Sequence, residues 1–155
     1  MFLPRIFKSL ELSVRERETH ELLELNEKTK EYGLVLTPDE IKEILTVRDQ
    51  VLHSYGRVEL GIEVSKALIE QFCTSPYLDK DHYASTLMEL HEIFYDLKNE
   101  TEDDIADAEL IDLLKKSFDE ECAGSLELLK SRMEEFARQF RLEAVKTLEE
   151  GDEGA

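Results

Sequence analysis

Apolar residues recur at intervals of three and four along most of this chain, which is the spacing of one face of an α-helix. The most regular stretch spans residues 81–99, with apolar positions at Tyr83, Leu87, Leu90, Phe94 and Leu97. A second stretch begins after Ser125 and runs to about Glu149, with Leu126, Leu129, Met133, Phe136 and Phe140. Each pattern predicts a helix with an apolar seam toward a partner helix. The two seams fit each other within one chain, or one of them fits a second protomer.

Capping residues mark the start of another helix. The segment Thr37-Pro38-Asp39-Glu40 places a capping Thr before a Pro at the first helical position, with a Glu three residues after the cap. This arrangement predicts a helix from Pro38 to about Tyr55, which Gly56 then interrupts.

The next predicted helix runs from Val58 to Cys73 and is apolar on more than one face. Its apolar residues are Leu60, Ile62, Val64, Leu68, Ile69 and Phe72. A helix that is apolar on most sides is usually surrounded by other helices. We therefore expect this helix at the centre of the molecule, with Gly61 as a point where a neighbour approaches closely.

The remaining segments are also helical in pattern. Residues 4–32 fit two short helices or one long bent helix, and residues 1–32 form a candidate peripheral arm. A shorter helix is predicted over 110–118, and residues 151–155 are expected to form a disordered tail. No segment has a convincing strand pattern. The chain is thus predicted to be all-α, a single-domain helical bundle of five to seven helices over residues 1–150.

The charge of the chain excludes two classes of partner. With 19 basic and 37 acidic residues, the net charge is −18. A field of this sign repels nucleic acid backbones and anionic lipid heads. No stretch approaches the roughly 20 apolar residues of a membrane span. We expect no direct nucleic acid binding and no membrane association.

Cysteine usage indicates a reducing compartment. Only Cys73 and Cys122 are present, each within an apolar helical context and without CxxC spacing. Neither a disulfide framework nor a zinc knuckle is indicated. We expect both residues to be buried in the core of a soluble, cytoplasmic protein.

Residues 118–130, FDEECAGSLELLK, have the general form of a calcium-binding loop between two helices. Asp119 and Glu121 stand at the first and third positions of the twelve-residue loop, with a glycine at the sixth. However, Ala123 and Lys130 occupy the fifth and twelfth positions, where calcium requires oxygen donors. Glu127 could serve only at the ninth. We reject Asp119, Glu121 and Glu127 as calcium ligands and predict a corner between two helices.

The sequence predicts no catalytic residue and no cofactor. The four histidines have no i, i+4 pair, and no ExxH motif of a di-iron bundle occurs. Neither cysteine lies in a nucleophile motif, and the glycines do not form a phosphate-binding loop. The chain therefore favours a protein without enzymatic activity.

The stretch YGRVELG at residues 55–61 combines an aromatic ring, an arginine and two glycines at a predicted corner. Tyr and Arg are enriched at interface hot spots. Tyr55, Arg57 and Glu59 therefore form a candidate docking surface. The simpler interpretation is that Arg57 pairs with a nearby carboxylate and fixes the corner.

Together with KNETEDD at 98–104 and FDEECAGSLELL at 118–129, this stretch resembles a family catalogued as a domain of unknown function. The resemblance covers residues from about Gly33 to Arg138. It implies a small, acidic, helical protein of the kind found mainly in anaerobic Gram-positive bacteria. No activity, ligand or catalytic residue comes with the family.

Three hypotheses about function stay open. The first is a non-enzymatic protein-protein interaction or adaptor protein, with an unidentified protein partner or as a homo-oligomer. The second is an acidic mimic of nucleic acid that blocks a DNA-binding protein. The third is a helical bundle that binds a metal or a small ligand in its core.

Overall fold

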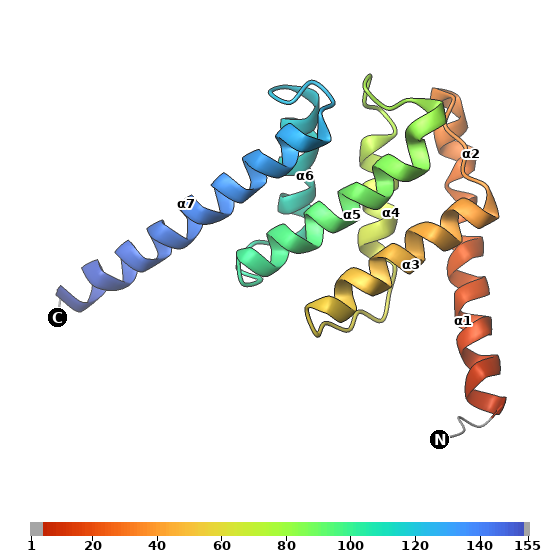
Figure 1. Ribbon diagram of the computed structural model, residues 1–155, viewed down its shortest axis with the longest axis horizontal. Coiled ribbons are helices and arrows are strands. Elements are labelled where there is room, and N and C mark those ends of the chain that lie inside the picture. Colours follow the sequence, from red (N-terminus) through yellow and green to blue (C-terminus); the bar gives the residue numbers. More distant parts are fainter. Residues whose placement is uncertain (1–4, 154–155) are drawn as a thin grey trace.

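The computed structural model describes residues 5–153, and of residues 5–9 and 151–153 it describes the backbone only. The fold is all-α as predicted, and the described residues contain no strand. In chain order the elements are α1 (Arg5–Glu24), α2 (Asn26–Thr29), η1 (Lys30–Tyr32), α3 (Pro38–Ser54), α4 (Glu63–Phe72), η2 (Lys80–His82), α5 (Tyr83–Glu100), α6 (Asp107–Asp119) and α7 (Leu126–Glu153) (Figure 1). No helix in this part of the chain is both long and apolar enough for a bilayer.

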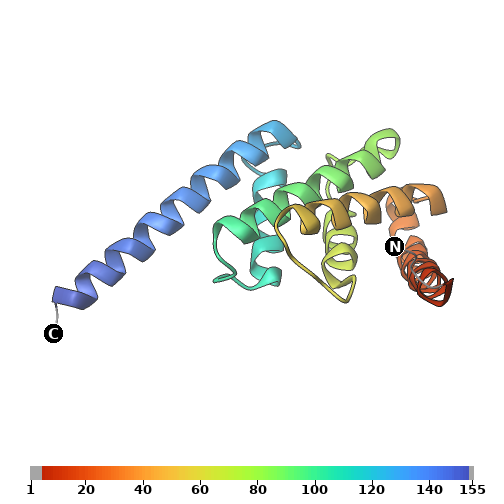
Figure 2. The same ribbon diagram turned by 60° about the horizontal axis from the view of Figure 1, so that its bottom comes forward.

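Helix α5 is the centre of the molecule. It contacts α3, α4, α6 and α7, and Figures 1 and 2 both show α3 and α7 on its two sides. All five apolar residues of its predicted seam are buried, as are His91, Ile93 and Tyr95 beside them. The expectation that the helix after Gly56 is central was wrong, because α5 packs against α3, α4, α6 and α7, whereas α4 packs mainly against α5 and α6.

The segment that connects α3 to α4, residues 55–62, is called the corner loop below. The predicted helix from Val58 to Cys73 starts only at Glu63. Within the loop, Ile62 is buried, but 85% of Val58 and 96% of Leu60 is exposed. The predicted close approach at Gly61 was also wrong, since a Cβ there would meet only the Glu63 side chain, at 3.8 Å. Leu60, one of the apolar residues of the predicted central helix, thus faces solvent together with Val58.

Local capping signals were predicted correctly. The Thr37 hydroxyl accepts a hydrogen bond from the Glu40 amide at 3.1 Å, and the Glu40 carboxylate accepts one from the Thr37 amide at 2.9 Å. At the start of α7, the Ser125 hydroxyl accepts a hydrogen bond from the Leu128 amide at 3.2 Å. These bonds satisfy amides that have no partner inside their helices.

The N-terminal segment is a helix that bends after Glu24 into α2 and η1. Leu22, near the end of α1, is buried in the core. Closer to the start of the helix, Leu10 is 55% exposed, Leu12 65% and Val14 45%. The first half of α1 therefore extends beyond the core (Figure 1).

Helix α7 packs on α5 and α6 with its first half and projects with its second. The two predicted seams therefore meet within one chain. From Arg141 to Glu150 every residue is exposed. The helix continues to Glu153, so residues 151–153 of the predicted tail are helical, and residues 154–155 lie outside the described part.

Candidate functional site

The three predicted docking residues all belong to the corner loop, and each is engaged by the body of the protein. The Tyr55 hydroxyl donates a hydrogen bond to Asp96 of α5. The Arg57 guanidinium donates two hydrogen bonds to Asp103, at 2.8 and 3.1 Å. This bidentate pair is the contact that the simpler interpretation of Arg57 predicts, and it fixes the corner.

Glu59 is the third anchor of the corner loop. Its carboxylate accepts a hydrogen bond from the Tyr95 hydroxyl at 2.7 Å and one from the Lys98 ammonium at 3.3 Å. Lys98 also pairs with Asp107, at 3.0 Å. Burial alone would lower the pKa of Lys98, but Asp107 and Glu59 outweigh that effect and raise it. Lys98 thus stays charged beside the loop.

Arg48 of α3 holds the loop from beneath. It is only 3% exposed and donates hydrogen bonds to the backbone carbonyls of Glu59, at 3.3 Å, and Gly61. It also donates to Asp49 at 2.9 Å, which in turn pairs with Arg15 of α1. A buried guanidinium is stable only when such partners surround it. The sequence offered no indication of this role, because the loop lies 11 to 13 residues away.

The hydroxyls of Tyr55 and Tyr95, next to the corner loop, stay protonated. Burial, followed by the Glu59 carboxylate, raises the pKa of Tyr95, so its hydroxyl remains a hydrogen-bond donor. Burial and the neighbouring Asp96 raise the pKa of Tyr55 to about 12. These groups therefore act as supports. What the loop offers to solvent is the apolar pair Val58 and Leu60.

A groove beside the corner loop, called the α1 groove, has a volume of ≈ 890 Å³. Its apolar walls are Leu10, Leu12 and Val14 of α1 and Leu60 of the loop. Charged side chains lie along it, and two of them, Arg15 and Asp49, form the ion pair that joins α1 to α3. The groove combines exposed apolar side chains with fixed charges, which suits a polypeptide segment.

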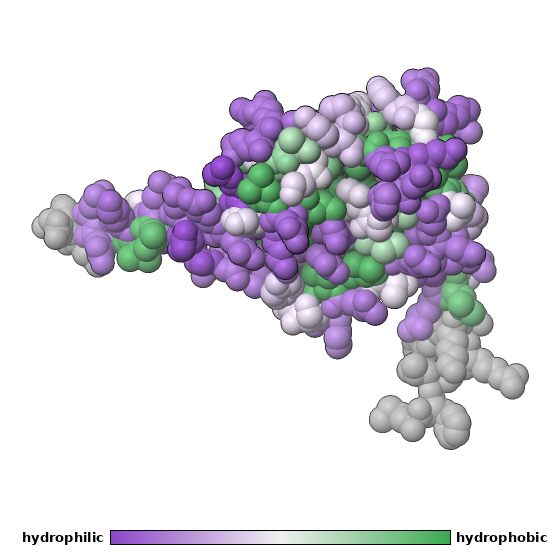
Figure 3. Space-filling view, turned by 45° about the horizontal axis from the view of Figure 1, so that its top comes forward, coloured by the Kyte–Doolittle hydropathy of each residue, from purple (hydrophilic) through white to green (hydrophobic). Residues whose placement is uncertain are grey.

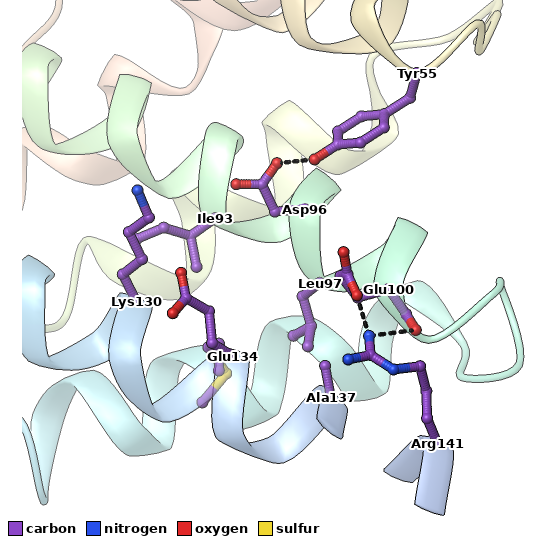
Figure 4. Close-up of a pocket in the computed structure, with 10 residues that line it drawn as sticks. Tyr55, Ile93, Asp96, Leu97, Glu100, Lys130, Glu134, Ala137 and Arg141 are labelled. Carbon is purple, nitrogen blue, oxygen red and sulfur yellow. Dashed lines mark hydrogen bonds and ion pairs between the residues drawn. The ribbon is translucent and has the colours of Figure 1, made fainter. Parts of the chain in front are cut away.

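A second hollow of ≈ 300 Å³ lies between the end of α3, α5 and α7 (Figure 4). Two of its carboxylates are already paired, Asp96 with Tyr55 and Glu100 with Arg141. Its lining contains no His, Cys or Ser. The lining of the hollow thus lacks the Ser-His or Cys-His pair of an acyl-transfer site.

A Ser-His pair is present, but in the core. The Ser65 hydroxyl lies 2.8 Å from Nε2 of His91, whose Nδ1 lies 2.6 Å from the Leu87 carbonyl oxygen. Both residues are 0% exposed. Burial lowers the pKa of His91 to about 4, so the ring is neutral at pH 7. The pair links α4 to α5 as a structural contact.

The sequence could have indicated burial of His91, because it follows Leu87 by four positions on the seam of α5. Its partner Ser65 carried no such indication, since 26 residues separate the two. Among the described residues, no group of three or more His, Cys, Asp and Glu side chains is arranged to hold a metal ion.

The rejected calcium candidates lie at the corner between α6 and α7. Asp119 accepts a hydrogen bond from Ser75 at 2.6 Å and pairs with Lys115. Glu121 pairs with Arg132 at 3.4 Å, and Glu127 is exposed in the first turn of α7. Helix α6 ends at Asp119 and α7 begins at Leu126, as the predicted corner requires.

A family model described as a family of unknown function (DUF6323) matches residues 21–146 of the chain. The match includes α3 to α6, the corner loop and most of α7, but only the end of α1. No curated protein and no solved structure matches the chain.

Proposed function

The chain belongs to this family of unknown function, and because membership supplies no activity, we propose from its surface that the protein is a non-enzymatic protein-protein interaction or adaptor protein. The docking surface is the corner loop. Tyr55, Arg57 and Glu59 hold the loop, while Val58 and Leu60 contact the partner.

One observation carries this proposal: Leu60 is 96% exposed on a loop that the buried Arg48 and three partly buried charged side chains hold in place. Exposed apolar side chains are common, but here the backbone of Glu59 and Gly61, on both sides of Leu60, is bonded to Arg48. A fixed loop loses little conformational entropy when it binds. Burying Leu60 would contribute about 1.5–3 kcal/mol.

The alternatives have weaker support. A nucleic acid mimic needs free carboxylates spaced like phosphates, and in the acidic run from Glu100 to Asp112 three carboxylates are paired: Glu100 with Arg141, Asp103 with Arg57 and Asp107 with Lys98. A ligand-binding core needs polar groups turned toward a cavity, and the polar groups beneath the loop bond to one another.

We place the protein in the bacterial cytoplasm. Both cysteines are free and buried, which suits a reducing compartment. The resemblance to a family of small acidic proteins, found mainly in anaerobic Gram-positive bacteria, supports a bacterial source.

A crosslinking pulldown from the native host tests the proposal. The wild type should recover a stoichiometric partner chain, and Leu60→Asp should lose it. The matched control is Val35→Asp, because Val35 is 57% exposed and precedes α3 outside the corner loop. If Leu60→Asp recovers the same chain in the same amount as wild type, the corner loop is not the docking surface.

A further inference from the structure

The projecting part of α7 presents a narrow apolar stripe to solvent. Residues 141–150, every one of which is exposed, are called the α7 arm. Within the arm, Leu142 is 61% exposed, Val145 52% and Leu148 73%. At 100° per residue, these three side chains fall within about 120° of the helix surface. Figure 3 shows a hydrophobic patch on the projecting helix, separated from the body by hydrophilic residues.

The two ends of the stripe have opposite charges. Arg141 directly precedes Leu142, and Glu149 directly follows Leu148. By the same helical geometry, Arg141 and Glu149 lie within the angular range of the stripe. The other three charged side chains of the arm lie outside that range: Glu143, Lys146 and Glu150. In a chain of net charge −18, this face therefore has one positive and one negative end.

The stripe is symmetric in spacing about Val145. Leu142 and Leu148 lie three positions before and after it, and the two charges lie four positions before and after it. In an antiparallel pair of arms with a two-fold axis at Val145, Leu142 meets Leu148 of the second copy. By the same register, Arg141 meets Glu149, and each contact occurs twice. A parallel pair would instead place like charges beside each other. The charges therefore favour a second copy in the antiparallel direction.

Arg141 remains accessible to a second carboxylate. It pairs with Glu100 of α5 through Nη1 (Figure 4), and its side chain is 44% exposed. A guanidinium has five N–H donors in a fixed fork, so Nη2 and Nε can donate to another acceptor. The pair with Glu100 holds the guanidinium at the body end of the stripe, which is where the end of a second, antiparallel arm arrives.

The body of the protein leaves room for this second arm. Met133 is buried against the body, and Val145 follows it by 12 positions, which is about 120° around the helix. Val145 also lies eight positions, or about 12 Å, beyond the buried Ala137, and Figure 1 shows the end of α7 projecting away from the other helices. In the antiparallel pair, the two acidic bodies lie on opposite sides of the centre and stay apart.

We propose that the α7 arms of two copies pair antiparallel, around a two-fold axis at Val145. The contact uses no residue of the corner loop, so it goes beyond the proposed function and can fail without affecting it. From Arg141 to Glu149 the stripe is about 12 Å long. Such a short contact buries less than the roughly 1,200–2,000 Å² of a stable interface. The pair is therefore weak, and its population depends on protein concentration.

Light scattering over a concentration series up to about 1 mM tests the pair. The mass should rise from 18.0 kDa toward twice that value and not beyond. Val145→Glu places like charges at the axis and introduces a better helix former, so it should stay monomeric with unchanged circular dichroism. The control Leu60→Asp, on the corner loop, should pair as the wild type does. A wild type that is monomeric at every concentration, a mass beyond two copies, or pairing of Val145→Glu overturns the inference.

Charge reversal tests the register of the arms. Arg141→Glu and Glu149→Arg should each weaken self-association by roughly tenfold, because the altered contact occurs twice. An equal mixture of the two variants should regain the wild-type affinity, since opposite charges then meet again. Glu149→Arg leaves the pair between Arg141 and Glu100 in place, so loss of that pair cannot explain its effect. The control Lys146→Glu lies outside the stripe and should have a smaller effect. Single variants that associate as strongly as the wild type refute the register.

Disulfide formation in oxidised glutathione tests the direction of the arms. Val145→Cys should link to itself, and Leu142→Cys mixed with Leu148→Cys should give a disulfide that joins positions 142 and 148, because only facing positions come close enough. The wild type is the control, since its cysteines are buried. If Leu148→Cys links to itself in preference to Leu142→Cys, the arms are parallel and the proposal is wrong.

Discussion

The corner between α6 and α7 depends on a glycine that no other residue can replace without displacement of its neighbours. Gly124 has a φ of +83°, a conformation in which a Cβ is unfavourable. Its amide donates a hydrogen bond to the Phe118 carbonyl at 2.9 Å, which closes the end of α6. A Cβ at this position would lie 2.6 Å from Cβ and 2.8 Å from Cγ of Tyr77.

Gly124→Ala therefore has two costs. The left-handed conformation of an alanine costs about 1–2 kcal/mol. The contacts with Tyr77 are about 1 Å shorter than the optimum for two carbon atoms, and overpacking of this kind costs about 1–3 kcal/mol. Because Cβ and Cγ lie next to the backbone, a change of rotamer cannot move them both away. The sum is a loss of about 2–5 kcal/mol.

Substitutions of two other glycines measure the conformational cost without the steric one. Gly33 has a φ of +76° and Gly56 of +65°, and a Cβ at either would meet no atom within 4 Å. Gly33→Ala and Gly56→Ala should lose only the conformational part, about 1–2 kcal/mol.

Urea titration followed by far-ultraviolet circular dichroism measures all three variants. Gly124→Ala should have the lowest midpoint, at an unchanged m value. Each kcal/mol corresponds to roughly 2–4 °C in melting temperature for a chain of this size. A loss for Gly124→Ala no larger than that of the two controls would show that Tyr77 does not confine this corner, and the reasoning would be refuted.

Three further predictions concern buried and paired side chains. Glu59→Ala should lower the free energy of unfolding by about 2–3 kcal/mol in urea titration. This is less than the roughly 3–5 kcal/mol of a fully buried pair, because Glu59 is partly exposed. The control Glu63→Ala, at an exposed neighbouring position, should change the free energy of unfolding little. His91 has a folded pKa of about 4 against 6.5 unfolded, so below pH 6.5 the unfolded chain binds the extra proton and stability falls until about pH 4. Between these two pH values the free energy of unfolding should fall by about 3 kcal/mol. This fall should be absent when the stability of His91→Gln is measured against pH. A variant with the same pH dependence as wild type would show that His91 does not have this lowered pKa. Millimolar calcium should leave the melting temperature unchanged, and an increase that magnesium does not reproduce would reopen Asp119 and Glu121 as ligands.

The candidate site was only partly predictable. The sequence indicated residues 55–61 by their composition, and it offered Arg57 pairing with a carboxylate as an alternative to docking. It did not indicate which carboxylate, because Asp103 lies 46 positions away. Arg48 and Tyr95, which support the same loop, had the pattern of ordinary helix residues. Their roles depend on the packing of α3 against α5, which no local pattern encodes.

The sequence by itself determined the helical class, the capped starts of α3 and α7, and the seams of α5 and α7. These features depend on hydrogen bonds within a few residues and on a period of 3.6, so a short window of sequence contains their cause. Only the tertiary structure decided that the two seams meet within one chain, that α5 is central and that residues 58–62 leave the helix. The reason is that Arg48 and Lys98, distant in sequence, bind this segment as an extended loop, and the resulting pairs outweigh the helical pattern of Val58 and Leu60.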